Sequence, residues 1–127
     1  MIDNCVEMEK FYYRRLQVYQ NAKQLAKEIN EVLKKFPDEE RFALTSQLRR
    51  ASTSIMFNIA EGFGRYSNKE RIHFIDIANG SLMEASSELD LSESYGYISA
   101  DELNEFDDKT IIIAKQLAKL RSTLQVE

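Results

Sequence analysis

Apolar residues recur at spacings of three and four positions through four long stretches of the chain, which is the spacing of one face of an α-helix. In the last stretch the residues that keep this spacing are Leu103, Phe106, Thr110, Ile113, Leu117, Leu120 and Leu124. The 127 residues include only one proline and four glycines, so few positions favour a break in a helix. The pattern therefore predicts four helices, over about residues 13–36, 38–64, 67–95 and 99–125.

Local signals mark the ends of these helices. Pro37 disfavours helical backbone at the residue before it and so ends the first helix. Ser67 with Glu70, and Ser99 with Glu102, fit the capping box, in which both side chains satisfy free backbone N–H groups. Four amphipathic helices joined by short turns predict an all-α fold. We expect an antiparallel up-down-up-down four-helix bundle that forms one domain over residues 1–127.

The composition is that of an ordinary globular protein, with 43% hydrophobic and 30% charged residues. The formal net charge of -4 argues against a general nucleic-acid binder. The charge is uneven, because residues 1–65 hold 11 Lys/Arg and 9 Asp/Glu, whereas residues 66–127 hold 6 and 12. Two interpretations stay open: the halves attract each other within one fold, or one face is locally basic.

The single cysteine, Cys5, excludes an internal disulfide and a zinc site built of several cysteines. The first residues lack the apolar core of a signal peptide. No stretch approaches the roughly 18 apolar residues of a membrane helix. We therefore expect a cytoplasmic protein.

Both the second and the fourth helix carry apolar residues away from their core faces. Phe57 falls opposite the core face of the second helix, and Met56 lies to one side of it. Ile111 and Ile112 are similarly turned away from the core of the fourth helix. A monomeric bundle has no use for these side chains, so we expect a homo-oligomer with an interface at these four positions.

A continuous polar line runs beside the core face of the second helix, through Gln47, Arg50, Ser54, Asn58, Glu61 and Arg65. A turn centred near residue 66 places Arg50 opposite Glu84, and Asn58 opposite Asp76, in the antiparallel third helix. We therefore predict an Arg50–Glu84 ion pair and an Asn58–Asp76 hydrogen bond, and we include Glu61 among the residues that fix the register of the helices. A solvated charged face is the alternative interpretation.

No catalytic residue, metal ligand or cofactor is predicted, and we expect that the protein is not an enzyme. Glu70 and His73 have the spacing of one di-iron ligand motif, but such sites need two motifs and the chain has one histidine. Glu84 and Glu88 lie one helical turn apart, but no histidine or second carboxylate layer accompanies them.

The best candidates for contact with nucleic acid are Arg49, Arg65, Lys69 and Arg71. The last three cluster at the turn between the second and third helices, where Tyr66 offers a ring on which a base could stack. On one subunit this patch is small, but symmetric repetition in an oligomer would multiply it.

Three stretches of the sequence are similar to one known family: Gln47-Leu48-Arg49-Arg50-Ala51, Asn58-Ile59-Ala60-Glu61-Gly62 and Ala78-x-Gly80-Ser81-Leu82-x-Glu84. They resemble the four-helix-bundle family associated with intervening sequences in bacterial 23S ribosomal RNA genes, whose members are often labelled ribosomal-type proteins. The resemblance spans about residues 12–125. It implies a closed bundle that assembles as a ring of identical chains, typically a pentamer, and a partner that is RNA or a ribonucleoprotein.

A related branch, the accessory variability determinants of diversity-generating retroelements, resembles this bundle too. The resemblance implies that members of that branch bind nucleic acid and a reverse transcriptase through a basic barrel surface. This chain departs from the branch because it is acidic overall.

Gly80 lies inside the third predicted helix, where a glycine costs up to about 1 kcal/mol relative to alanine. Its place between Ala78 and Ser81 predicts a close approach of two helices, so Gly80→Leu should disrupt the bundle.

Together these patterns predict a non-enzymatic helical-bundle assembly protein, with the RNA- or ribonucleoprotein-related role that the resemblance implies. A protein-interaction scaffold without nucleic-acid binding is the alternative, and a small metal-binding or catalytic bundle is a third reading.

Overall fold

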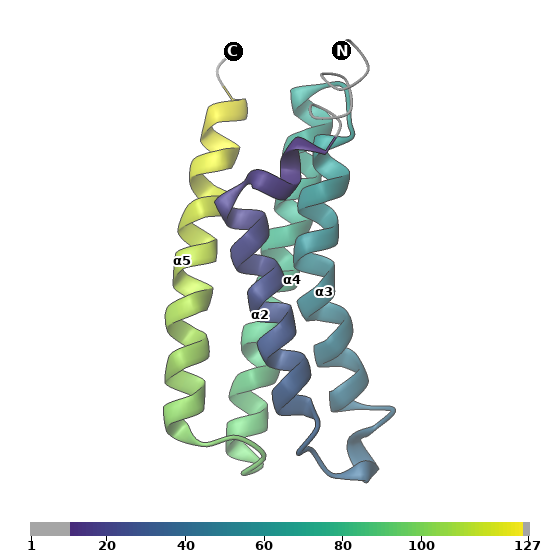
Figure 1. The fold of residues 1–127 in the computed structure, drawn as a ribbon, viewed down its shortest axis with the longest axis vertical. Helices are drawn as coiled ribbons and strands as arrows, with labels where there is room; N and C mark the ends of the chain where they lie inside the picture. The colour runs from purple at the N-terminus through teal and green to yellow at the C-terminus, as the bar shows by residue number, and fades with distance from the viewer. Residues whose placement is uncertain (1–10, 126–127) are drawn as a thin grey trace.

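Four long helices run alternately up and down in the computed structural model, which describes residues 11–125 (Figure 1). They are α2 (Gln17–Leu33), α3 (Leu44–Phe63), α4 (Asn68–Ser94) and α5 (Ala100–Leu124). Two short 3-10 helices, η1 (Tyr12–Arg15) and η2 (Asp38–Glu40), precede α2 and α3. Each long helix packs against the next in the chain, and α2 also contacts α5. The predicted all-α up-down bundle is therefore confirmed. Cys5 lies outside the described residues.

The first two helices begin later than the apolar spacing predicted. Leu16 adopts extended backbone, with φ -68° and ψ 131°, and this separates η1 from α2. Ala43, with φ -120° and ψ -106°, separates η2 from α3. The predicted starts at 13 and 38 were therefore wrong by several residues. Apolar spacing indicates which face of a helix is buried, but it does not reveal a single residue with non-helical backbone.

Serine caps start the last two helices. The Ser99 hydroxyl accepts a hydrogen bond from the Glu102 backbone N–H, and the Glu102 carboxylate accepts one from the Ser99 backbone N–H. This confirms the predicted capping box. At α4 the Ser67 hydroxyl accepts from the Glu70 N–H at 3.1 Å, but the Glu70 carboxylate accepts from that hydroxyl instead of the backbone N–H. The second box is thus only half formed.

The core runs the length of the bundle and receives side chains from every long helix. Large side chains with less than 2% exposure are Leu25, Ile29, Leu48, Ile55, Ile59, Ile75, Leu82, Leu89, Ile113 and Leu117. These residues follow the spacings of three and four that predicted the helices. None of the helices described between residues 11 and 125 is long and apolar enough to cross a membrane.

The close approach of α3 and α4 is at Gly62 and not at Gly80. A Cβ atom added to Gly62 would lie 3.1 Å from Phe74 Cβ and 3.4 Å from the Arg71 carbonyl oxygen. A Cβ atom on Gly80 would meet nothing within 4 Å, because Gly80 is exposed on the outer face of α4. The prediction that Gly80 permits helix packing was therefore wrong.

Candidate functional site

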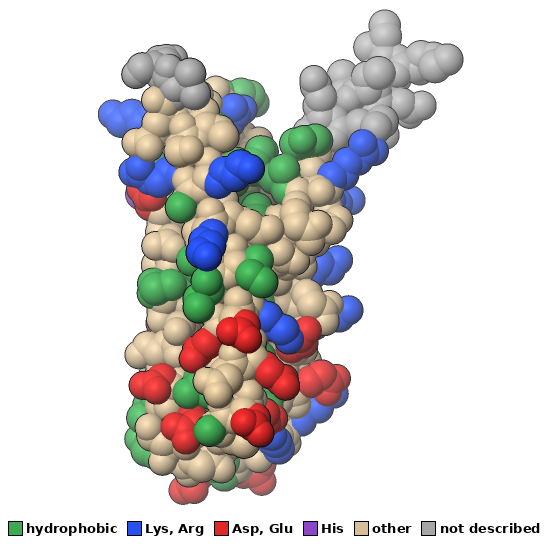
Figure 2. Space-filling view, turned by 90° about the vertical axis from the view of Figure 1, so that its left-hand side faces the viewer, with side chains coloured by type: hydrophobic (Ala, Val, Ile, Leu, Met, Phe, Trp, Pro, Cys, Tyr) green, Lys and Arg blue, Asp and Glu red, His purple; other side chains and the backbone are tan. Residues whose placement is uncertain are grey.

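Charge is sorted along the long axis of the bundle. Residues 65–71, which cover the end of the α3–α4 connection and the first turn of α4, carry Arg65, Lys69 and Arg71. At the opposite end, residues 84–108 carry nine carboxylates and no lysine or arginine. Figure 2 shows the result on the face around α5, where basic side chains occupy the upper part and acidic side chains gather below. We call the end that holds the α3–α4 turn and the end of α5 the basic end.

Three of the four predicted nucleic-acid contacts lie at the basic end, and one does not. Arg65 lies in the α3–α4 turn, and Lys69 and Arg71 lie in the first turn of α4. Arg49 is exposed near the start of α3. The 16 residues from Arg49 to Arg65 correspond to about 24 Å along a helix, so Arg49 belongs to the other half of the bundle.

Two of the arginines at the basic end build the turn itself. Arg71 Nε donates to the Arg65 carbonyl oxygen at 2.9 Å, and an Arg71 terminal nitrogen donates to Asn68 Oδ1 at 3.3 Å. The Arg65 guanidinium lies over the Phe74 ring, 4.5 Å from its centre, and 3.9 Å from the Glu61 carboxylate. Lys69 is exposed and makes no ion pair within residues 11–125.

The fold adds cations near this end that the sequence pattern did not single out. Lys115 and Lys119 are exposed, one turn apart in the second half of α5, and have no ion-pair partner in the described part of the chain. Arg121 joins α5 to α4, with 2.7 and 3.2 Å between its nitrogens and the Asp76 carboxylate. That hydrogen-bonded pair lowers the pKa of Asp76. The Arg121–Asp76 pair sets the antiparallel register of α5 on α4, so Lys119 and Lys115 lie along α5, roughly 13 and 20 Å along the bundle axis from Lys69.

The cross-helix contacts of the polar line differ from the predicted ones. Ser54 and Ser81 are joined by a 2.8 Å hydrogen bond, one residue from the predicted register. The Asn58 amide donates to Ser54 and not to Asp76, which pairs with α5. Asp76 lies on the α5 side of α4, so the expected partner was on the wrong face.

The Arg50–Glu84 ion pair is also absent among the described residues. Arg50 is exposed, and its charge acts on Glu88, one turn beyond Glu84. Glu61 pairs with Arg65 in the turn that follows α3, so it does not fix the register between α3 and α4. The register is set instead by the two serines and the glycine at position 62.

Glu88 is a carboxylic acid buried against α3. It is 8% exposed, and its Oε1 atom has no hydrogen-bond partner in the described structure. Burial raises its pKa to about 7 and the nearby Glu84 charge adds to the effect, while the Arg50 charge opposes it. Glu88 is therefore partly protonated near neutral pH, unlike an ordinary surface glutamate.

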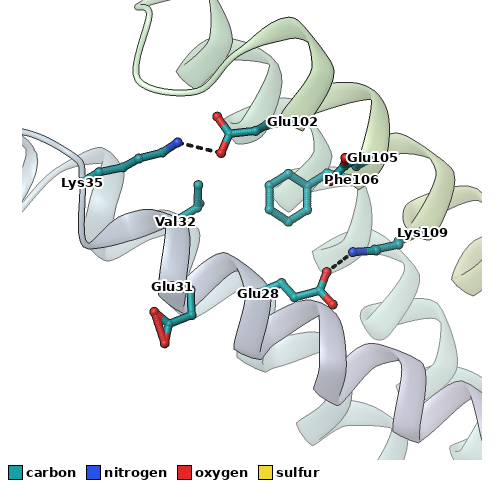
Figure 3. A pocket seen from close by; sticks show the side chains of 8 residues that line it. All are labelled: Glu28, Glu31, Val32, Lys35, Glu102, Glu105, Phe106 and Lys109. Carbon is teal, nitrogen blue, oxygen red and sulfur yellow. Dashed lines mark hydrogen bonds and ion pairs between the residues drawn. The ribbon is translucent and has the colours of Figure 1, made fainter.

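A groove of about 430 Å³ lies between α2 and α5, in the half of the bundle away from the basic end (Figure 3). Two ion pairs cross it, Lys35–Glu102 at 2.6 Å and Lys109–Glu28. Figure 3 shows the buried Phe106 ring between them. The two ion pairs hold the end of α2 against α5. Because both lysines are bound to carboxylates across the groove, the groove offers no free cation to a ligand.

Three of the four predicted interface residues are exposed. Phe57 is 60% exposed on α3, and Ile111 and Ile112 are each 51% exposed on α5. Met56 is partly buried and packs against the core, so its assignment to an outer face was wrong. On α4, Ile77 is also 37% exposed. The apolar surface is therefore divided between α3–α4 and α5.

Within residues 11–125 no three histidine, cysteine, aspartate or glutamate side chains are grouped closely enough to hold a metal ion. His73 and Phe74 pack edge to face, with 5.5 Å between ring centres. Glu70 is engaged with Ser67 at the start of α4.

Comparison with known proteins gives a matching family model and similar solved structures. The family model described as 23S rRNA-intervening sequence protein matches residues 14–119. A crystal structure of a protein of unknown function from the S23 ribosomal protein family of Bacteroides thetaiotaomicron is similar, with a TM-score of 0.75 and 25% sequence identity. The match covers 82% of this chain and 97% of that one. No curated protein matches the sequence.

Proposed function

The chain belongs to the 23S rRNA-intervening sequence protein family, and from that premise we propose that it is a non-enzymatic helical bundle that assembles with itself and binds RNA at its basic end. The observation that supports RNA binding is the set of exposed cations at that end and along the second half of α5. Lys69, Lys115 and Lys119 have no ion-pair partner in the described chain. Cations that are not neutralised internally are available for phosphate groups.

The negative net charge does not oppose this proposal, because nine of the carboxylates lie within residues 84–108, away from the basic end. α4 has 27 residues and is therefore about 40 Å long. The Debye length at physiological ionic strength is about 8 Å. Carboxylates near the end of α4 are thus separated from a phosphate at the start of α4 by several screening lengths.

Removing the three free lysines together should weaken RNA binding. We expect the Lys69→Ala/Lys115→Ala/Lys119→Ala variant to bind an RNA hairpin with a single-stranded loop about tenfold less tightly at 0.15 M salt. Each lost phosphate contact also removes a released counterion, so the slope of log affinity against log salt should fall by about 2 for three contacts to a single strand. Filter binding over a salt series measures both quantities.

The matched control removes three cations from the acidic half, in Lys34→Ala/Arg41→Ala/Arg49→Ala. It changes the net charge equally and should keep the affinity and the salt slope of the parent protein. Equal losses in both triple variants would mean that only net charge matters, and the basic end would then not be the binding site. Absence of RNA binding by the parent protein would reject the RNA part of the proposal and favour a protein-interaction scaffold.

We also propose that the exposed apolar residues form a contact between unlike faces of neighbouring subunits. Phe57 and Ile77 lie on α3 and α4, whereas Ile111 lies on α5. A two-fold dimer needs one self-complementary patch, but two separate patches suit a head-to-tail contact that closes into a ring. The resemblance implies five subunits in that ring.

A mixing experiment tests this arrangement. Phe57→Glu and Ile111→Glu should each yield monomers by size-exclusion chromatography with light scattering, because each places a charge in the apolar contact. Mixed in equal amounts, they should form a one-to-one dimer, because each supplies the face that the other lacks. Phe42→Glu, which changes an 87% exposed ring next to η2, should leave the assembly intact. A monomeric parent protein, or variants that do not pair when mixed, would exclude the proposed contact.

A further inference from the structure

Tyr66 presents almost its whole side chain to solvent at the tip of the α3–α4 turn. It is 98% exposed, more than any other large hydrophobic residue described. Other tyrosines pack against aromatic neighbours: Tyr13 lies 5.0 Å from Tyr19, and Tyr95 lies 5.4 Å from Tyr97, between ring centres. Tyr66 has no aromatic neighbour among the described residues and contributes almost nothing to burial. The fold therefore does not explain why a large ring occupies this position.

The backbone on both sides of Tyr66 is held in place. The Arg65 carbonyl oxygen accepts from Arg71 Nε at 2.9 Å, and the Arg65 N–H donates to the Gly62 carbonyl at 3.1 Å. Ser67 caps α4 through the Glu70 N–H. A ring on a fixed turn loses less conformational freedom on binding than one on a mobile loop.

The surroundings of Tyr66 are suited to a strand with negative phosphates and exposed bases. Arg65 precedes it, and the unpaired Lys69 follows three residues later. Aromatic rings beside cations are the usual platform for bases of single-stranded nucleic acid, because every base has a face that can stack. In a duplex the bases are already stacked and only phosphates and groove edges are available.

We propose that Tyr66 stacks on an unpaired base, so that the basic end binds single-stranded RNA in preference to duplex. The inference rests on the proposed RNA binding and adds the form of RNA that is recognised. Lys69 then contacts a phosphate near the stacked base, while Arg65 and Arg71 keep the turn in shape.

The test compares 12-nucleotide oligo(U) with a 12-base-pair RNA duplex. The parent protein should bind the single strand more tightly, and Tyr66→Ala should weaken that binding about tenfold while changing duplex binding less than twofold. Tyr66→Phe should keep the parent affinity, since stacking needs the ring and not the hydroxyl. Phe42→Ala is the matched control, because it removes another exposed ring that lies beside a cation. The guanidinium carbon of Arg41 is 5.3 Å from the centre of the Phe42 ring.

A second measurement reports the stacking itself. The chain has no tryptophan, so Tyr66→Trp introduces a single indole at the proposed site. Its fluorescence should be quenched by oligo(U) and much less by the duplex. If Tyr66→Ala binds oligo(U) as tightly as the parent, or if duplex is preferred, the stacking proposal is overturned while RNA binding stands. If neither RNA binds, both proposals fail.

Discussion

Gly62→Leu should lower the free energy of unfolding by about 2 kcal/mol. A Cβ atom at this position already meets Phe74 Cβ at 3.1 Å and the Arg71 carbonyl oxygen at 3.4 Å, and leucine adds three more carbon atoms. Overpacking typically costs about 1 to 3 kcal/mol, and we expect the upper value here because three further carbon atoms follow a Cβ that is already crowded. Leucine also gains about 1 kcal/mol of helix propensity over glycine, which offsets part of the cost. The helices α3 and α4 can relieve the overlap only by moving apart.

The same substitution at Gly80 should change the free energy of unfolding in the opposite direction. Gly80 has open space where its Cβ would be, so Gly80→Leu keeps the gain in propensity and should raise stability by about 0.5 to 1 kcal/mol. Urea unfolding followed by circular dichroism at a single protein concentration compares the two variants with the parent. A loss of stability at Gly80 equal to that at Gly62 would contradict the packing described for α4.

The two glycines show what apolar spacing can and cannot predict. The spacing identified the four helices and the face that each one buries, because burial follows the helical period. Gly62 lies on the buried face of α3 and Gly80 on the exposed face of α4, so close packing was predicted at the wrong glycine. A glycine inside a helix lowers the stability of that helix, and this can be predicted from the sequence. Whether close packing compensates for the loss depends on the distance to the next helix, which only the structure gives.

The cations at and near the basic end show a second limit of prediction from the sequence. Arg65, Lys69 and Arg71 were predicted together because they are close in the sequence. Lys115 and Lys119 were not predicted, because nothing in the spacing of α5 marks them as functional. Their position along α5, level with the first half of α4, depends on the pairing of α4 with α5. Likewise, the predicted register was right to within one residue, but partners failed where side chains point to a different neighbouring helix.

Glu88 should make the bundle less stable as the pH rises from about 4.5 to 8. Its pKa is raised from 4.5 to about 7 in the folded protein, so the folded state retains a proton that the unfolded chain releases. The stabilisation is complete below about pH 4.5 and is lost as the pH rises through about 7. At about 1.4 kcal/mol for each unit of the shift from 4.5 to about 7, the loss is about 3 kcal/mol by pH 8. The lowered pKa values of Glu28, Asp76 and Glu102 act in the opposite sense and at lower pH.

Glu88→Gln separates the effect of this one group from the rest. The amide has nearly the same shape and no charge, so the variant should match the parent near pH 4.5 and exceed its unfolding free energy by about 3 kcal/mol at pH 8. Glu84→Gln, at an exposed position one turn away, should change stability much less at either pH. Urea unfolding at half-unit steps between pH 4.5 and 8 gives both curves. If Glu88 ionises while it is buried against α3, the unfolding free energies of the parent and of Glu88→Gln must diverge as the pH rises. Parallel curves would instead show that Glu88 titrates like an exposed glutamate and would contradict the prediction.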